Sequence, residues 1–341
     1  MTVPLEVAPH PALRVKSGAL VRHDIWSMPD TSSPVFRFAP SPNGYLHLGH
    51  ARSALLGAGM ARAAGGRFLI RIEDIDPARC LPVYETAILS DLARLGIASD
   101  GPVRRQSAHF DLYAQALARL KALGLVYPSF LSRSEIKARV AAHVAETGRP
   151  WPSDPDGAPI YPGDERDLAP SQARARIASG AQVIWRLDMA RALACAGSLD
   201  WQESGDEDPD AAIDRAALAG TRVFRTIVAD PARWGDVILA RADVPTSYHL
   251  SVVVDDADQA ISDVVRGADL FQATAVHRLL QSLLDLPQPR YHHHALVRDA
   301  SGRKLSKSDG DARLALLFDQ GLDRAAIAHL VGLADAPSHS R

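Results

Sequence analysis

The chain has 341 residues, of which 47% are hydrophobic and 23% charged, as in an ordinary globular protein of two or three domains with a sizeable core. Its net charge of −2 gives no global basic signature for nucleic acid, although a local basic face could still bind RNA. Cys80 and Cys195 are far apart and indicate a reducing compartment, and no apolar run is long enough to span a membrane. We therefore expect a cytoplasmic protein, in which the polar residues 1–33 are a flexible extension and not a secretory signal.

Residues 34–126 are predicted to form the first half of an α/β domain. The expected elements are, in chain order, a strand at 35–39, a helix at 48–64, a strand at 67–72 and helices at 82–95 and 108–123. This alternation of strand and helix favours a parallel sheet with helices on its faces.

The middle of the chain, residues 127–243, is predicted to be a smaller α+β insertion. The segment 148–166 is dense in Pro, Gly and Asp, which is typical of a loop. Short strands are expected at 183–188 and 236–240. Between them the acidic segment 203–214, "ESGDEDPDAAID", is expected to be a solvated loop.

Regular α/β patterning returns in residues 244–300, which we expect to be the second half of the first domain, with a helix at about 273–284. Residues 301–341 would add a polar loop and a short helical tail. The sequence therefore predicts one α/β domain that is split by an insertion.

The segment 36–50, "FRFAPSPNGYLHLGH", joins the first strand to the first helix through a rigid turn. Its prolines fix φ, and its glycines let a ligand lie against the backbone. His47 and His50 fall in the first turn of the helix, where exposed N–H groups and the helix dipole favour an anion such as phosphate. The alternative for so short a motif is a pair of capping or surface histidines.

The segment 302–310, "GRKLSKSDG", places two lysines, Lys304 and Lys307, in a polar loop bounded by glycines. Such a loop can close over a polyphosphate and neutralise the charge that grows in a transition state. The alternative is a solvated basic loop.

The segment 69–79, "LIRIEDIDPAR", runs from a buried strand directly into Glu73 and two aspartates. Carboxylates at the carboxyl end of a strand lie beside any ligand in the crevice, and they can hold an ammonium group. The alternative is a solvated acidic turn that pairs with Arg71 and Arg79.

Together these motifs resemble the class I aminoacyl-tRNA synthetases, and finer matches narrow the resemblance to the glutamyl branch. The matching segments, in the order of that family, are "RFAPSPNGYLHLGHARSAL", "GGRFLIRIEDIDPAR", "YHLSVVVDDADQAISDVVRGADL", "YHHHALV" and "GRKLSKS". A glutamyl-tRNA synthetase continues from the last segment into a large helical anticodon-binding portion, whereas only residues 311–341 follow here. The chain therefore resembles the truncated family, the glutamyl-Q tRNA(Asp) synthetases, with a Rossmann-like catalytic domain and no anticodon-binding domain.

This resemblance implies a ligase with two reactions. It would activate L-glutamate with ATP and Mg²⁺ in the absence of tRNA, and then transfer the glutamyl group to queuosine in the anticodon of tRNA(Asp). One alternative is a truncated glutamyl-tRNA synthetase that charges tRNA(Glu) with the help of a separate anticodon-binding protein. Another is an inactive tRNA-binding paralogue. We expect a monomer in each case.

The resemblance also implies roles for individual residues. Those implied to bind glutamate are Arg37, Ala39, Ser41, Glu73, Tyr248 and Arg266, and those implied to bind ATP are His47, Gly49, His50, Lys304 and Lys307. His47, His50 and Lys307 are implied to be catalytic, the histidines through the phosphates and the lysine through the leaving pyrophosphate. An arginine fork suits a carboxylate, and Glu73 would hold the α-ammonium. The Ala-Pro-Ser-Pro sequence of residues 39–42 favours glutamate over glutamine.

Members of this family often carry a zinc site, and here the chain departs from the pattern. Ser129, Leu131 and Glu165 stand where cysteines would be, so we predict no zinc. Proline-rich packing or the longer insertion would have to hold the subdomain together instead. The histidines 292–294 are also not predicted to bind a metal, because consecutive residues of a strand alternate between its faces; only His293 is expected near the crevice.

Overall fold

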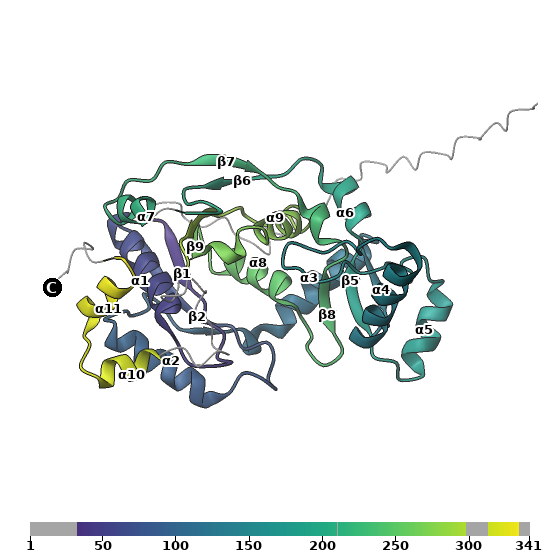
Figure 1. Ribbon diagram of the computed structural model, residues 1–341, viewed down its shortest axis with the longest axis horizontal. Coiled ribbons are helices and arrows are strands. Elements are labelled where there is room, and N and C mark those ends of the chain that lie inside the picture. Colours follow the sequence, from purple (N-terminus) through teal and green to yellow (C-terminus); the bar gives the residue numbers. More distant parts are fainter. Residues whose placement is uncertain (1–32, 210, 298–312, 334–341) are drawn as a thin grey trace, which may run out of the picture.

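Figure 1 shows the computed structural model of the protein, which describes residues 33–209, 211–297 and 313–333. The strands are, in chain order, β1 (Val35–Phe38), β2 (Arg67–Ile72), β3 (Arg104–Arg105), β4 (Val126–Ser129), β5 (Ile184–Leu187), β6 (Asp200–Glu203), β7 (Arg225–Val228), β8 (Ile238–Arg241), β9 (Asp263–Gly267) and β10 (Arg290–His294). The helices are α1 (Leu48–Ala63), α2 (Pro82–Arg94), α3 (Phe110–Ala122), α4 (Arg133–Thr147), α5 (Pro170–Ala178), α6 (Met189–Ala196), α7 (Ala211–Leu218), α8 (Tyr248–Asp258), α9 (Thr274–Leu283), α10 (Leu314–Asp319) and α11 (Arg324–Leu330). Within these ranges every helix is too short or too polar to cross a lipid bilayer.

The larger sheet has seven strands in the order β3-β2-β1-β9-β10-β6-β7. Each neighbouring pair is parallel except β6 and β7, which are antiparallel. Parallel strands need helical crossovers, and these cover the faces of the sheet. The predicted α/β class with a mainly parallel sheet is therefore confirmed.

A second, smaller sheet is formed by the antiparallel strands β4, β5 and β8, and helices α4 and α5 lie beside it (Figure 1). The local sequence sets the bounds of α4. Ser132 caps its first turn in a reciprocal capping box with Glu135, and Gly148 ends it with φ of 65°. The strands predicted at 183–188 and 236–240 are confirmed as β5 and β8.

The acidic segment 203–214 is only in part the solvated loop that its composition predicted, because Glu207 and Asp208 are exposed but its ends are not. It begins in β6 and ends in α7, and its end residues, Glu203 and Asp214, are fully buried. Each of them accepts a hydrogen bond from a buried histidine of β10, Glu203 from His293 and Asp214 from His292. Because β6 and β7 extend the larger sheet, part of the range 127–243 belongs to the main α/β structure and not to the smaller sheet.

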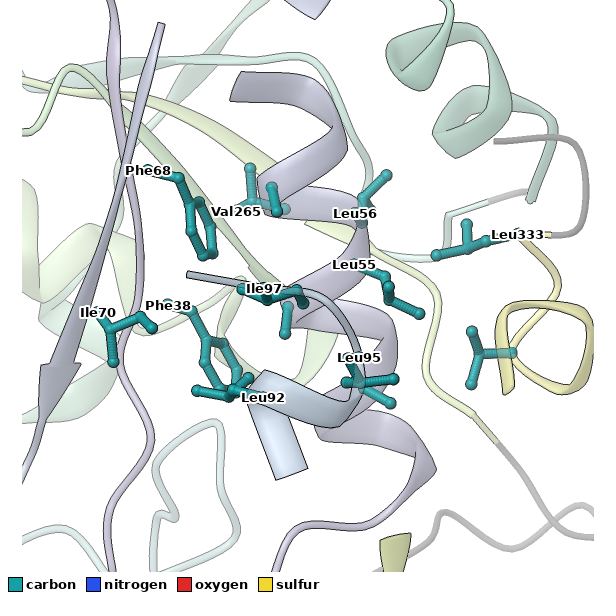
Figure 2. Close-up of a cluster of buried hydrophobic side chains, with 14 of the residues drawn as sticks. Phe38, Leu55, Leu56, Phe68, Ile70, Leu92, Leu95, Ile97, Val265 and Leu333 are labelled. Atoms are coloured by element: carbon teal, nitrogen blue, oxygen red, sulfur yellow. The ribbon is translucent and has the colours of Figure 1, made fainter. Parts of the chain in front are cut away.

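Alternation along the central strands separates an apolar face of the sheet from a face that carries charge. Phe36 and Phe38 of β1 pack with Phe68 of β2 and with α1 in the largest hydrophobic core (Figure 2). The intervening positions place Arg37 and Arg71 on the other face, toward α8. Buried arginines need charged partners, and Asp256 of α8 supplies one to both Arg37 and Arg71.

Candidate active site

A cavity of about 420 Å³ lies where the carboxyl ends of β1, β2 and β9 meet the start of α1 and of α8. The predicted site residues that line it are Arg37, Ala39, Ser41, His47, Gly49, His50, Glu73, Tyr248 and Arg266. Segments more than two hundred residues apart are thus brought to one edge of the sheet, which is the edge where α/β proteins bind ligands. Lys304 and Lys307 lie outside the described residues.

The two histidines of the first motif cap helix α1. The Nδ1 atom of His47 accepts the backbone N–H of Gly49 at 3.0 Å, and Nδ1 of His50 accepts the backbone N–H of His47 at 3.2 Å. A ring nitrogen that accepts a hydrogen bond carries no proton, so a neutral imidazole in this position bears its proton on Nε2. Capping therefore uses Nδ1 of each ring and leaves Nε2 as the nitrogen that carries the proton in a neutral ring.

Gly49 is required by this arrangement. A Cβ atom at Gly49 would lie 2.9 Å from Cε1 and 3.1 Å from Nδ1 of His47, closer than side chains pack. Glycine is thus the residue that lets the His47 ring fold over its own helix.

A buried cluster of charges borders the cavity. Arg37 donates from Nε and Nη2 to Asp256 of α8, at 3.2 and 3.5 Å. Arg71 donates to the same carboxylate at 2.5 Å and lies 3.8 Å from Asp255 and 3.9 Å from Glu73. Burial alone would raise the pKa of Asp256, but the two guanidinium groups hold it below its ordinary value, so this carboxylate is ionised.

Glu73 follows β2 directly and faces both the cavity and the charge cluster. Burial raises the pKa of its carboxyl group to about 7, although Arg71 and Arg37 act in the opposite direction. A carboxyl group in this state changes its charge near neutral pH. It would gain an ionic partner when a ligand brings an ammonium group into the cavity.

The second pocket arginine, Arg266, is already engaged by the protein. Its partners are His293 Nε2 at 3.0 Å, Tyr248 Oη at 3.4 Å, His277 Nδ1 at 3.2 Å, the carbonyl of Leu270 at 3.2 Å and Thr274 Oγ1 at 2.7 Å. Burial lowers the pKa of His293 to about 4 and that of His277 well below its ordinary range, so both rings are neutral acceptors. These five contacts match the five N–H groups of an arginine. Arg37, whose Nη1 hydrogen-bonds none of the described residues, is therefore the guanidinium that remains open to a carboxylate.

This geometry can be compared with known proteins. A family model described as "tRNA synthetases class I (E and Q), catalytic domain" matches residues 35–193 and 219–338. The glutamyl-Q tRNA(Asp) synthetase of Rhodobacter capsulatus is 46% identical over 302 residues, which cover 88% of this chain and 100% of that protein. The chain belongs to the glutamyl-Q tRNA(Asp) synthetase family.

Other relatives place this family within the glutamyl branch. The glutamyl-Q tRNA(Asp) synthetase of Leptothrix cholodnii is 40% identical, with 88% of this chain and 90% of that protein covered. The glutamate–tRNA ligase 2 of a Methylobacterium is 36% identical, but the match covers only 60% of its length. The crystal structure of a glutamate tRNA ligase from Elizabethkingia meningosepticum, in complex with its amino acid, superposes with a TM-score of 0.62 at 25% identity. That match covers 82% of this chain and 52% of the ligase.

The positions where this chain lacks the cysteines of a zinc-binding family member are occupied by a hydrogen-bonded cluster. Glu165 is buried, and its carboxylate accepts the backbone N–H of Phe130 at 2.9 Å, the hydroxyl of Tyr161 and Nη1 of Arg176 at 3.2 Å. Ser129 accepts from Arg186 at 3.1 Å and donates to the carbonyl of Ile184 at 3.0 Å. Leu131 offers no ligand atom. In the described ranges no group of three or more His, Cys, Asp or Glu side chains is arranged to hold a metal.

His293 was the histidine expected near the crevice, but it is His294 that lines the cavity. The sequence analysis also missed Asp256, which pairs with Arg37 beside the cavity. The signal was present, because two adjacent aspartates interrupt an otherwise apolar helix in "SVVVDDA". Buried aspartates in such a run require buried cations. The alternative pairing of Arg71 with the acidic turn is met in part: Arg71 lies 3.9 Å from Glu73, but it donates its hydrogen bonds to Asp256 and Gln259, on α8 and just after it.

Proposed function

We propose that this chain is an enzyme that activates L-glutamate with ATP and transfers the glutamyl group to queuosine in the anticodon of tRNA(Asp). The observation that carries the proposal is one cavity in which an open arginine, Arg37, and a titrating carboxyl group, Glu73, face the N-terminus of α1. The relatives named for this activity, matched over 88% of this chain, support the same substrates.

Glutamate has three charged groups, and the cavity offers a partner for each kind. The guanidinium of Arg37 can bind a carboxylate through paired N–H donors. Glu73 can bind the α-ammonium group, and Tyr248 and Ser41 supply hydroxyl groups on the same wall. A neutral amide in place of the side-chain carboxylate would lose the charge-assisted contact with the guanidinium of Arg37, so glutamine is disfavoured.

The first reaction needs positioning and charge stabilisation more than proton transfer. An oxygen of the glutamate α-carboxylate attacks the α-phosphorus of ATP, an acyl–phosphate bond forms, and the bond to the β-phosphate breaks to release pyrophosphate. A carboxylate is already a nucleophile at pH 7, so no general base is required. The Nε2–H groups of His47 and His50 and the N-terminus of α1 would stabilise the phosphates, and Lys307 would stabilise the pyrophosphate. Mg²⁺ would enter with ATP, held by the phosphates themselves, and share their charge.

In the second reaction a hydroxyl group of the cyclopentenediol of queuosine attacks the glutamyl carbonyl, and AMP leaves. A second cavity of about 570 Å³ shares Ser41, Asn43, Glu73 and Tyr248 with the first and extends to β8 of the smaller sheet. It therefore offers an acceptor nucleoside room beside the activated carboxyl group. We assign the acceptor to this second cavity.

We also propose that the smaller sheet is held without zinc. Three donors already bind the Glu165 carboxylate, and Arg186 stacks on the Tyr161 ring with its guanidinium carbon 3.7 Å from the ring centre. The positively charged side chains of Arg176 and Arg186 therefore lie where a zinc ion would otherwise hold the subdomain together. A hydroxyl and a leucine cannot replace the thiolates that structural zinc requires.

The test is glutamate-dependent exchange of pyrophosphate into ATP without tRNA, followed by transfer of labelled glutamate to purified tRNAs. We expect exchange without tRNA, transfer to tRNA(Asp) that contains queuosine, and none to a transcript of the same tRNA with guanine at that position. Transfer to tRNA(Glu) alone would instead favour a truncated glutamyl-tRNA synthetase. Exchange that requires tRNA would count against the proposal.

A further inference from the structure

Arg37 is the open arginine of the cavity, and a single carboxylate holds it. Among the described residues, Asp256 is the sole side chain to which Arg37 donates hydrogen bonds, through Nε and Nη2. Both side chains are buried, with relative exposures of 5% and 6%. Hydrogen bonds along the Nε–Nη2 edge fix the orientation of a guanidinium group, and Arg37 lines the cavity while it is held in this way.

We propose that Asp256 is a positioning residue for substrate recognition: it fixes the guanidinium of Arg37 in the orientation that receives a carboxylate of glutamate. This inference rests on the proposed function for the identity of the substrate. Asp256 acts through Arg37 and does not line the cavity itself, so it is not a catalytic residue.

The other arginine that Asp256 contacts depends on it less. Arg71 also donates from Nε to Gln259 at 2.8 Å, and its Nε lies 3.8 Å from Asp255. When Asp256 is neutralised, Arg71 keeps these two partners, whereas Arg37 loses its charge-assisted hydrogen bonds, which go to no other described side chain. The effect of such a change is therefore concentrated on Arg37.

The chain contains a matched control in Asp263. It is also a fully buried aspartate between two arginines, with Arg222 at 2.5 Å and Arg290 at 2.8 Å. It stands at the amino end of β9, whereas the cavity lies at the carboxyl end of the same strand. Loss of this carboxylate removes a comparable ion cluster without touching the cavity.

The experiment compares Asp256→Asn with Asp263→Asn in glutamate-dependent pyrophosphate exchange on the full chain. We expect Asp256→Asn to raise KM for glutamate roughly 10- to 100-fold while KM for ATP and the rate at saturating glutamate change less than about threefold. Asp263→Asn should leave KM for glutamate unchanged, even if it lowers Tm as much. Equal KM values for glutamate in the two variants would overturn the inference.

A double-mutant cycle separates positioning from a general structural effect. In an Arg37→Ala background, Asp256→Asn should raise KM for glutamate by less than about twofold, because the group that Asp256 orients is gone. Additive effects would overturn the inference. If Asp256→Asn does not fold, Asp256→Glu decides: it keeps the charge but moves the carboxylate by one methylene, and a wild-type KM for glutamate would contradict the proposal.

Exchange by the wild-type enzyme distinguishes failure of the proposed function from failure of the role of Asp256. Exchange with glutamate in the wild type, together with equal behaviour of the two aspartate variants, refutes the role of Asp256 alone. Absence of glutamate-dependent exchange in the wild type refutes the proposed function, and the role of Asp256 falls with it.

Discussion

The titration of Glu73 gives the structure a pH signature. Burial raises the pKa of this carboxyl group to about 7, and only the ionised form can attract the ammonium group of glutamate. At pH 8 about nine tenths of the free enzyme is ionised at this position, and at pH 6 about one tenth. The kcat/KM for glutamate should therefore fall about tenfold between pH 8 and pH 6, with a midpoint near pH 7. Since the ordinary pKa of a glutamate side chain is 4.5, an unperturbed Glu73 would give no such change in this range.

Three buried histidines near the cavity do not produce this step. Burial lowers the pKa of His249, His293 and His294 to about 4, so these rings stay neutral from pH 6 to pH 8. The matched variant Glu73→Gln has the same size and no charge to titrate. It should lose the charge-assisted contact, worth roughly 1.5–3 kcal/mol or about 10- to 150-fold in kcat/KM at pH 8, and it should lose the step near pH 7.

The assay is pyrophosphate exchange at saturating ATP and varied glutamate, measured across pH 6–8 for both proteins. A flat wild-type profile would show that Glu73 does not control substrate binding. A step that persists unchanged in Glu73→Gln would assign the titration to another group. Either result refutes the assignment of Glu73 to the ammonium group.

Three further changes address other parts of the site. Gly49→Ala should displace the His47 ring from its cap and lower the free energy of unfolding by about 1 kcal/mol, measured as a lower Tm. In exchange kinetics it should raise KM for ATP but not KM for glutamate. An unchanged KM for ATP would show that the cap is not needed for phosphate binding. Arg37→Ala should weaken glutamate use far more than ATP use, and equal losses in the two KM values would mean that Arg37 is misassigned. Glu165→Ala removes the acceptor of the Phe130 N–H, of the buried Tyr161 hydroxyl and of the half-exposed Arg176, and should cost about 3 kcal/mol of unfolding free energy. EDTA should leave the wild-type Tm unchanged, and a Tm that falls with EDTA would reveal a structural metal.

The sequence predicted the position of the candidate site where the site residues lie in short contiguous motifs. Strand, rigid turn and helix start in 36–50 predicted a ligand site at the carboxyl edge of a parallel sheet, and the structure places His47, His50 and Glu73 around one cavity there. These residues meet at one cavity because each motif lies at the junction of a strand and its following segment. The register of a parallel sheet then brings such junctions together.

The sequence was uninformative where function depends on pairs of distant residues. Arg37 and Asp256 are 219 positions apart, and neither local sequence indicates that the two residues pair. The acidic segment 203–214 shows the same limit, because its composition suggested solvent while Glu203 and Asp214 are each paired with a histidine of β10. Charge composition predicts solvent exposure only when no buried cation or histidine from a distant segment pairs with the acidic side chains.

The most direct test of the central claim is the position of the glutamyl group on the product tRNA. The enzyme is given labelled glutamate, ATP and tRNA(Asp) that contains queuosine, and the product is digested to nucleosides. The proposed function predicts that the label is found on the queuosine nucleoside of the anticodon and that the 3′-terminal adenosine carries none. Label on the terminal adenosine, or on tRNA(Glu) in a parallel reaction, would contradict it.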